Sequence, residues 1–442
     1  MCRVCPLQIP FIHKEFILFK TFISAAAVSL LIFQIPALHA GGGQASKGVT
    51  LTLYGNADDL AKPYMKQVFA AWESKTGNKI DIQGLEGSNA EAILLTKFTT
   101  GDIPDILIHF GNYHLLNFRV EENFYDFSNA LWVQDIQESV LPQTKVNGKV
   151  YGLPFWEASV SGMFYNKKIF ARLGLSPPKT QAEFEALCDQ MLAAGIQPIF
   201  CATTDAWPIL YQYALDPVFD SPQGEQLLNR LNKNEIRYAD IPQARAMLEW
   251  FKRAAEKGYY GKNFMTDRWD YMSEVLGKGE AAIVYCWDTW FDTDYDNASY
   301  TYKKDDFGLM PAFMGTADNG TFEGPNVNLL MVNKKSPQVT AALDLIDFMS
   351  KPENYNAAFN GIATNPVFKG QVTNKPSAQY QEVKDWVSRV GHASIAQPKI
   401  IGYSQVQGGK IIQSLMSGSI TIDECIRQLD EDRINTLKSF TQ

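Results

Sequence analysis

Beyond residue 48 the hydrophobic positions follow two alternating periods. Apolar residues at every second position predict strands over 49–55 and 79–84, and a nearly continuous apolar run predicts a buried strand over 103–110. Between these strands, apolar residues three and four positions apart predict helices over 58–77 and 89–102. The order strand–helix–strand–helix–strand is typical of a mostly parallel sheet that is covered by helices on its faces.

The same alternation continues through the rest of the chain. Further strands are predicted over 149–155, 159–170, 196–202, 280–287, 306–313 and 327–333, and helices over 180–195, 242–258, 337–350 and 417–440. The helix over 180–195 begins with Thr180 as its cap and has Glu183 at the capping-box position. Two stretches of α/β pattern in 442 residues predict two or three domains and exclude a single small module.

The first forty residues have the pattern of a secretory signal. Three basic residues against one acidic residue precede the uncharged apolar run 21–33, and small residues follow at Ala40 and Gly42. The apolar run is shorter than a typical membrane span, although an uncleaved anchor is the alternative interpretation. No cysteine lies directly after the run at the expected cleavage point, so lipid attachment is not expected. We therefore expect cleavage between Ala40 and Gly42 and a periplasmic protein.

The composition narrows the classes of partner. With 40 basic and 48 acidic residues the formal charge is −8, which does not suggest a nucleic acid or an anionic membrane as partner. Nine tryptophans are enough to line a binding cleft as well as to fill cores. Cys188 and Cys201 are the nearest pair of the four cysteines beyond the signal and either form a disulfide or remain buried thiols. No CxxC occurs among these four cysteines, and we expect no metal and no cofactor.

Four segments in this order resemble one family. They are GDIPDILI (101–108), GKVYGLPFWEASVSGMFYNKKIFARLGLSPPKT (148–180), GKGEAAIVYCWDTW (277–290) and GSITIDECIRQLDE (418–431). Their order and spacing resemble the extracytoplasmic solute-binding proteins of ABC importers, specifically the carbohydrate-binding family that includes maltose-binding protein. The resemblance covers nearly the whole chain beyond the signal.

The resemblance implies an α/β protein of two lobes, each a mostly parallel sheet flanked by helices, with the ligand cleft between them. By analogy the first lobe is 48–155 plus 314–365, and the second is 156–313 plus 366–442. The implied function is a non-catalytic, monomeric receptor that captures a sugar or oligosaccharide by lobe closure and delivers it to a membrane permease.

The predicted ligand contacts follow the ends of strands, where ligands bind in open α/β sheets. Aromatic rings can stack on the C–H faces of sugars, while carboxylates and amides bind the hydroxyl groups. The candidates are Asn56, Asp58, His109, Asn112, Trp156, Glu157, Trp207, Trp287, Asp288, Trp290, Glu323 and Asn326.

Structural roles compete with some of these assignments. Trp72 fits the apolar face of a helix and is expected in a core, as are Trp250 and Trp386. Asp58 is also placed to cap a helix. Trp287 and Trp290 are close enough in sequence that only one of them needs to face the cleft.

Other chemistry is less well supported by the sequence. GKGEAA (277–282) precedes a strand, which is the wrong place for a dinucleotide-binding turn, and DTDYDNAS (292–299) lacks the glycine and final carboxylate of a calcium loop. A receptor for glycerol phosphate is one rival, but a phosphate needs Arg or Lys, which the candidate set lacks. An extracytoplasmic glycoside hydrolase, using paired carboxylates, is the other.

Overall fold

The computed structural model describes residues 48–86, 90–111, 115–116, 118–295, 300–390, 392–393 and 396–441. The predicted signal over 1–40 and the candidate Asn112 lie outside these residues. Among the helices of the described part of the chain, none has the length and apolar character needed to span a membrane.

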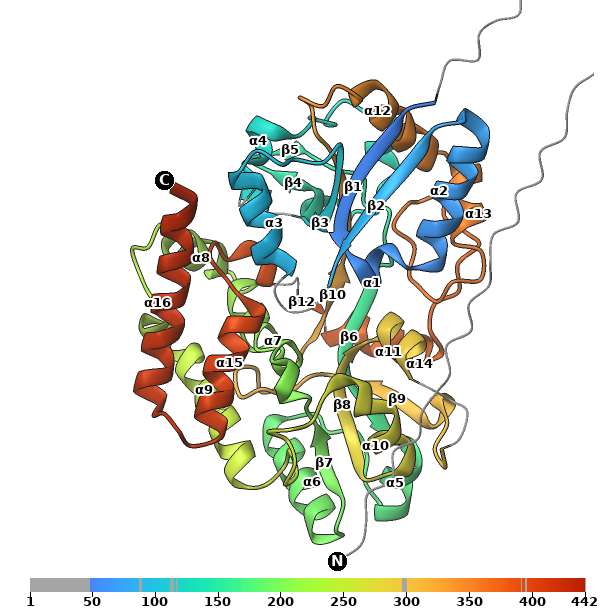
Figure 1. Ribbon diagram of the computed structural model, residues 1–442. Coiled ribbons are helices and arrows are strands. Elements are labelled where there is room, and N and C mark those ends of the chain that lie inside the picture. The colour runs from blue at the N-terminus through green and yellow to red at the C-terminus, as the bar shows by residue number, and fades with distance from the viewer. Residues whose placement is uncertain are drawn as a thin grey trace, which may run out of the picture. The chain divides into compact units, whose positions relative to one another are not determined.

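The first sheet has four strands in the order β11-β3-β1-β2 (Figure 1). They are β1 (Thr50–Asn56), β2 (Lys79–Leu85), β3 (Ile106–Phe110) and β11 (Asn328–Val332). β1 pairs in parallel with both β2 and β3, and β11 is antiparallel to β3. The predicted strands and the mostly parallel character are therefore confirmed for this sheet.

Helices cover the first sheet and enclose its core. They are α1 (Ala57–Leu60), α2 (Pro63–Thr76), α3 (Ala90–Thr99), α4 (Val120–Asn123), α12 (Val339–Met349) and α13 (Pro352–Ala358). Trp72 is fully buried there, as predicted, and donates to Asp344 Oδ2 at 2.8 Å. The helix predicted over 58–77 is divided at Lys62, because Pro63 has no N–H to continue an upstream helix and starts α2 instead.

The second sheet has the order β12-β10-β6-β8-β7, with β9 also paired to β6. Its strands are β6 (Ser159–Asn166), β7 (Gln197–Phe200), β8 (Ala281–Trp287), β9 (Phe307–Met310), β10 (Phe322–Asn326) and β12 (His392–Ala393). β7 is parallel to β8 and β10 to β12, whereas β6 is antiparallel to β8, β9 and β10. The sheet is thus mixed rather than mostly parallel, because β6 runs in the direction opposite to β8, β9 and β10.

Ten helices pack on the second sheet or beside it in the described residues. They are α5 (Lys167–Leu173), α6 (Gln181–Ala193), α7 (Gln212–Phe219), α8 (Gly224–Asn232), α9 (Pro242–Glu256), α10 (Met272–Lys278), α11 (Asp288–Asp294), α14 (Ala378–Val390), α15 (Gln405–Met416) and α16 (Ile422–Thr441). The predicted cap of α6 is confirmed, since Thr180 Oγ1 accepts from the Glu183 N–H at 3.1 Å. Trp250 is fully buried, and Trp386 lies edge-on to Phe322, which confirms both as packing residues.

Short elements complete the chain. They are the hairpin β4 (Lys145–Val146) and β5 (Lys149–Val150), and the 3₁₀ turns η2 (Leu131–Asp135), η3 (Leu141–Thr144), η4 (Thr203–Asp205), η5 (Trp207–Ile209), η6 (Tyr238–Asp240), η7 (Trp269–Tyr271), η8 (Lys304–Asp306) and η9 (Gln397–Lys399).

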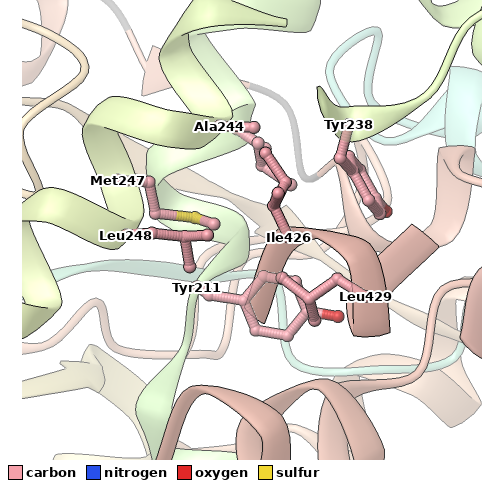
Figure 2. A pocket seen from close by; sticks show the side chains of 8 residues that line it. Tyr211, Tyr238, Ala244, Met247, Leu248, Ile426 and Leu429 are labelled. Carbon is pink, nitrogen blue, oxygen red and sulfur yellow. The ribbon is translucent and has the colours of Figure 1, made fainter. Parts of the chain in front are cut away.

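An apolar crevice between α9 and α16 belongs to the core of the second sheet. Met247 and Leu248 of α9 face Ile426 and Leu429 of α16, with Tyr211 beneath them (Figure 2). The side chains leave no room for a water molecule. The crevice is therefore a packing feature and no ligand site.

The chain passes between the two sheets at three places in the described residues. Ala158 packs in the first core and Val160 in the second; β10 is directly followed by β11; and Phe368 packs in the first core whereas Val383 packs in the second. The residue ranges of the two lobes, with boundaries at 155, 313 and 365, remain predictions.

The four described cysteines are free thiols. Cys188, Cys201, Cys286 and Cys425 are all buried. Of the two alternatives left open by the sequence, the structure has the buried thiols and no bond between Cys188 and Cys201. Burial raises the pKa of the Cys201 thiol to about 12, so this group is unreactive at neutral pH.

Candidate functional site

The candidate site lies where strands of both sheets end beside the passages between them. β1 and β3 end at Asn56 and Phe110, and β7 and β8 end at Phe200 and Trp287. The passage into β6 begins at the same edge, because Ser161 of β6 is opposite Trp287. Side chains that follow these strands are therefore brought to the border between the sheets, as the rule for open α/β sheets requires.

Four tryptophans form a continuous cluster at this border. Ring centroids are 5.1 Å apart for Trp287 and Trp290, 5.5 Å for Trp290 and Trp207, and 4.9 Å for Trp207 and Trp269. Trp287 is buried, while the other three are half-buried. Trp287 and Trp290 both belong to the cluster. Sequence reasoning missed Trp269, because it follows a loop and no strand points to it.

Two buried carboxyl groups lie beneath Trp287. The Trp287 indole Nε1 donates to Glu323 Oε1 at 3.2 Å, and Glu323 in turn faces Asp216 of α7. Burial raises the pKa of Glu323, and the neighbouring Asp216 raises it further. Burial also raises the pKa of Asp216 to about 7. The two groups therefore hold at least one proton between them at neutral pH.

A lysine between the helices α1 and α2, beside the first sheet, reaches the tryptophan cluster. Lys62 Nζ lies 3.0 Å from Glu157 Oε1 and 5.9 Å from the centre of the Trp290 ring. Burial raises the pKa of Glu157, although Lys62 opposes this shift. For Lys62 burial lowers the pKa, but Glu157, Asp294 and Asp59 together outweigh burial and the net shift is upward. Lys62 was missed because the sequence predicts it inside a helix, whereas Pro63 places it at the junction of α1 and α2.

Beside this pair, Asp59 points inward, whereas Asn56 and Asp58 are exposed. Asn328 Nδ2 donates to Asp59 Oδ2 at 2.9 Å, and burial raises the pKa of Asp59 to about 7. Asn56 Oδ1 instead accepts from the Asp58 N–H at 2.9 Å and caps α1, while the Asp58 side chain is exposed. This hydrogen bond of Asn56 is local, and the ligand role of Asn56 and Asp58 remains a prediction.

Asp288 connects the passages to the second sheet. Its Oδ1 accepts from the N–H groups of Val160 and Thr289, both at 2.9 Å, and its Oδ2 accepts from Ser377 Oγ at 3.0 Å. Burial raises the pKa of Asp288 to about 7. Asn326 lies opposite Ser159 at the end of β10. Both residues are near the border, but Asp288 is engaged in holding backbone segments together.

The remaining candidates pack in the first core. The His109 ring lies 4.8 Å from that of Phe118 and 5.7 Å from that of Phe110, in edge-on arrangements. Trp156 is buried and meets Tyr64 edge-on at 6.2 Å. The structure therefore brings together five candidates: Glu157, Trp207, Trp287, Trp290 and Glu323. His109 and Trp156 instead lie against aromatic rings of the first lobe. Within the described residues no group of three His, Cys, Asp or Glu side chains is arranged to hold a metal ion.

Comparison with known proteins gives one family. The model of the bacterial extracellular solute-binding proteins matches residues 57–356. An uncharacterized ABC transporter extracellular-binding protein of Pyrococcus horikoshii is 25% identical over 306 residues, 68% of this chain and 69% of its own. The melibiose/raffinose/stachyose-binding protein MelE of Bacillus subtilis is 22% identical over 74% of this chain and 76% of its own. The sn-glycerol-3-phosphate-binding periplasmic protein UgpB of Shigella flexneri is 23% identical over 58% and 60%, respectively.

Solved structures have the same fold. The binding protein msmE of Bacillus subtilis, in an open conformation, has a TM-score of 0.72 at 19% identity, covering 90% of this chain and 99% of its own. A sugar transporter protein of Bacillus licheniformis in complex with stachyose has a TM-score of 0.69 at 20% identity, covering 86% and 98%. These similarities establish the two-lobed fold, in which the border between the sheets is the border between the lobes.

Proposed function

Because the chain belongs to the bacterial extracellular solute-binding proteins, we propose that it captures a sugar or oligosaccharide and delivers it to the permease of an ABC importer. Members of this family are binding proteins rather than enzymes. The single observation that carries the proposal is the cluster of Trp207, Trp269, Trp287 and Trp290 beside buried carboxyl groups at the lobe border. Aromatic faces suit the C–H faces of sugar rings, and the carboxyl groups suit the hydroxyls.

Binding draws on both lobes. Lys62 and Asp59 come from the first lobe, and the tryptophans come from the second. A ligand that contacts both sets binds the closed arrangement better than the open one and so shifts the protein towards closure. The similarity to the melibiose/raffinose/stachyose-binding protein MelE and to the structure in complex with stachyose supports an oligosaccharide as the class of ligand.

The glycerol phosphate alternative has one observation in its favour and one against it. UgpB is among the relatives, and Lys62 supplies the cation that the predicted site lacked. However, Glu157 already occupies the Lys62 ammonium at 3.0 Å, and the nearby Asp59, Glu323 and Asp216 are all acidic. A phosphate would have to displace Glu157 and approach these carboxyl groups, so a neutral ligand is favoured.

The experiment is a thermal-shift and calorimetry screen with melibiose, raffinose, stachyose, maltose and glycerol 3-phosphate. A ligand present at about 100 times its dissociation constant adds roughly 2.7 kcal/mol of stability. Binding of a sugar, with the sugar recovered intact by chromatography, is the expected result. Hydrolysis products would indicate a glycosidase. A rise in melting temperature with glycerol 3-phosphate alone would favour a glycerol phosphate receptor.

Export of the protein as a periplasmic monomer is part of the proposal. It is supported by the basic-then-apolar pattern of residues 1–40 and by the extracellular family. Mass spectrometry of the exported protein should give a first residue between Gly41 and Gly43, and light scattering should give the mass of one chain. A retained leader would contradict cleavage.

A further inference from the structure

Trp207 is presented by a segment whose backbone is strained at both ends. Ala206, directly before it, has φ 63° and ψ −42°, and Leu210, at the other end of η5, has φ 44° and ψ 42°. Non-glycine residues seldom adopt positive φ, and such strain persists only where the surroundings enforce it. Within residues 206–216 only the Trp207 side chain is not buried. The strain therefore brackets the single residue of this segment that faces outward.

The first turn of α15 enforces this backbone. Gln405 Nε2 donates to the Trp207 carbonyl oxygen at 2.8 Å. A Cβ on Gly409 would lie 2.3 Å from the Ala206 carbonyl oxygen, and a Cβ on Gly408 would lie 2.4 Å from the Tyr211 hydroxyl. Two adjacent glycines disfavour a helix, yet here they allow the segment to lie directly against the helix backbone. On the other side, Cys201 Sγ contacts the Pro208 carbonyl oxygen at 4.0 Å.

Three local rules are thus broken at one place: two positive-φ residues without glycine, and a glycine pair inside a helix. Each of them opposes local stability. Such coincidences are typical of functional positions, where geometry is held at the expense of stability.

We propose that residues 206–210 and the first turn of α15 form a rigid mount that fixes the Trp207 indole in its ligand-contacting orientation. Ala206, Leu210, Gln405 and Gly409 are the positioning residues of this mount. The inference rests on the proposed function, since the indole is fixed for a ligand. Fixing the ring before binding removes an ordering cost, so the mount raises affinity without contacting the ligand itself.

The test is the variant Ala206→Gly, because glycine relieves the strain and lets the segment move. The matched control is Asn147→Gly, which relieves a positive φ of 49° on the exposed hairpin between β4 and β5. Both proteins are labelled with 5-fluorotryptophan, and the Trp207 resonance is assigned by its loss in Trp207→Phe. Melting temperature and raffinose affinity are measured on the same samples.

The expected result is a Trp207 fluorine signal that broadens or splits in Ala206→Gly and is unchanged in Asn147→Gly, while the melting temperature of neither variant falls. If the competent orientation drops to about one fifth of the population, the dissociation constant for raffinose rises about fivefold. A purely structural strain would leave the fluorine signal of Ala206→Gly unchanged, and that result overturns the mount. Failure of the wild type to bind any sugar contradicts the proposed function instead, and the fluorine comparison still decides on the mount.

Discussion

The two lobes end at their common border with different kinds of side chain. The second lobe presents tryptophans whose rings pack on one another, held by short turns such as η5 and η7. The first lobe presents small polar groups and a lysine; Asn56 bonds locally to Asp58, and Asn328 of β11 bonds to Asp59 of α1. The aromatic area thus comes from the second lobe, together with the buried carboxyl groups of Glu323 and Asp216, and the ammonium group comes from the first.

This difference indicates how the two lobes share the work of recognition. Stacking on an indole gives binding energy over a broad area with little dependence on the position of each hydroxyl. A buried ammonium or carboxyl group rejects any ligand that leaves it without a partner. The second lobe is therefore expected to supply affinity, and Lys62, Asp59 and Glu157 at the border are expected to supply selectivity and closure.

The largest effect is expected from Lys62→Met. Glu157 is 2% exposed, and its carboxylate forms an ion pair with the Lys62 ammonium. Removing one partner of a buried pair leaves the other charge unpaired, so unfolding free energy should fall by about 3 kcal/mol at pH 8. Denaturant unfolding at pH 8 and pH 5 measures this. The loss should be smaller at pH 5 than at pH 8, because burial raises the pKa of Glu157 and so favours its neutral form as the pH falls.

The double variant Lys62→Met/Glu157→Gln is the control. It removes both charges and should recover most of the stability lost in the single variant. Equal stability of the single and double variants would show that the pair is not coupled, and the first lobe would then contribute no charge to the border.

Next in size is the effect of Trp207→Ala on affinity. The half-buried indole lies between Trp269 and Trp290, at 4.9 and 5.5 Å. Loss of a central aromatic anchor should cost roughly 2 kcal/mol, or about thirtyfold in dissociation constant. Calorimetry with the sugar found in the screen measures it. Trp207→Phe retains a flat face and should recover part of the loss. Normal affinity in the alanine variant would refute the stacking role, and early melting with poor binding would make Trp207 a core residue.

The sequence predicted the repetitive parts of this molecule better than the singular ones. The strands ending at Asn56, Phe110 and Trp287 were found because alternating or continuous apolar residues report burial directly. The mixed character of the second sheet was missed, since no change of period in the sequence marks a strand that runs antiparallel to its neighbours.

For the site, strand ends led to five of the clustered residues, including Trp207 and Glu323. They could not lead to Lys62, Asp59, Trp269 or Asp216, which reach the border from helices, a helix junction and a 3₁₀ turn. Only Pro63 after Lys62 hinted at a break there. Contacts such as that between Lys62 and Trp290 join residues far apart in the chain and depend on tertiary packing, which local sequence patterns do not reveal.

A pH-dependent effect concerns the acidity of the first-lobe edge. Burial raises the pKa of Asp59 to about 7, far above the ordinary 3.8, so the folded protein holds a proton that the unfolded chain releases between about pH 4 and pH 7. This group's contribution to stability therefore falls as pH rises through that window, by up to about 1.4 kcal/mol per pH unit. Asp59→Asn can keep the contact with Asn328 and should flatten the melting temperature against pH between 5 and 8. Curves of equal slope would contradict the raised pKa.

The smallest effect separates a structural from a ligand-binding role at the end of β1. Asn56 Oδ1 accepts from the Asp58 N–H at 2.9 Å, which is the geometry of a helix cap. Replacing such a cap by alanine costs about 1 kcal/mol of stability, and Asn56→Asp can retain the cap. We expect Asn56→Ala to lower the melting temperature slightly and to leave sugar affinity within about twofold, a difference well below one hydrogen bond. A loss of affinity comparable to that of Trp207→Ala, with unchanged melting, would place Asn56 in contact with the ligand. The first lobe would then contribute direct binding energy, and the contrast between the two lobes would no longer hold.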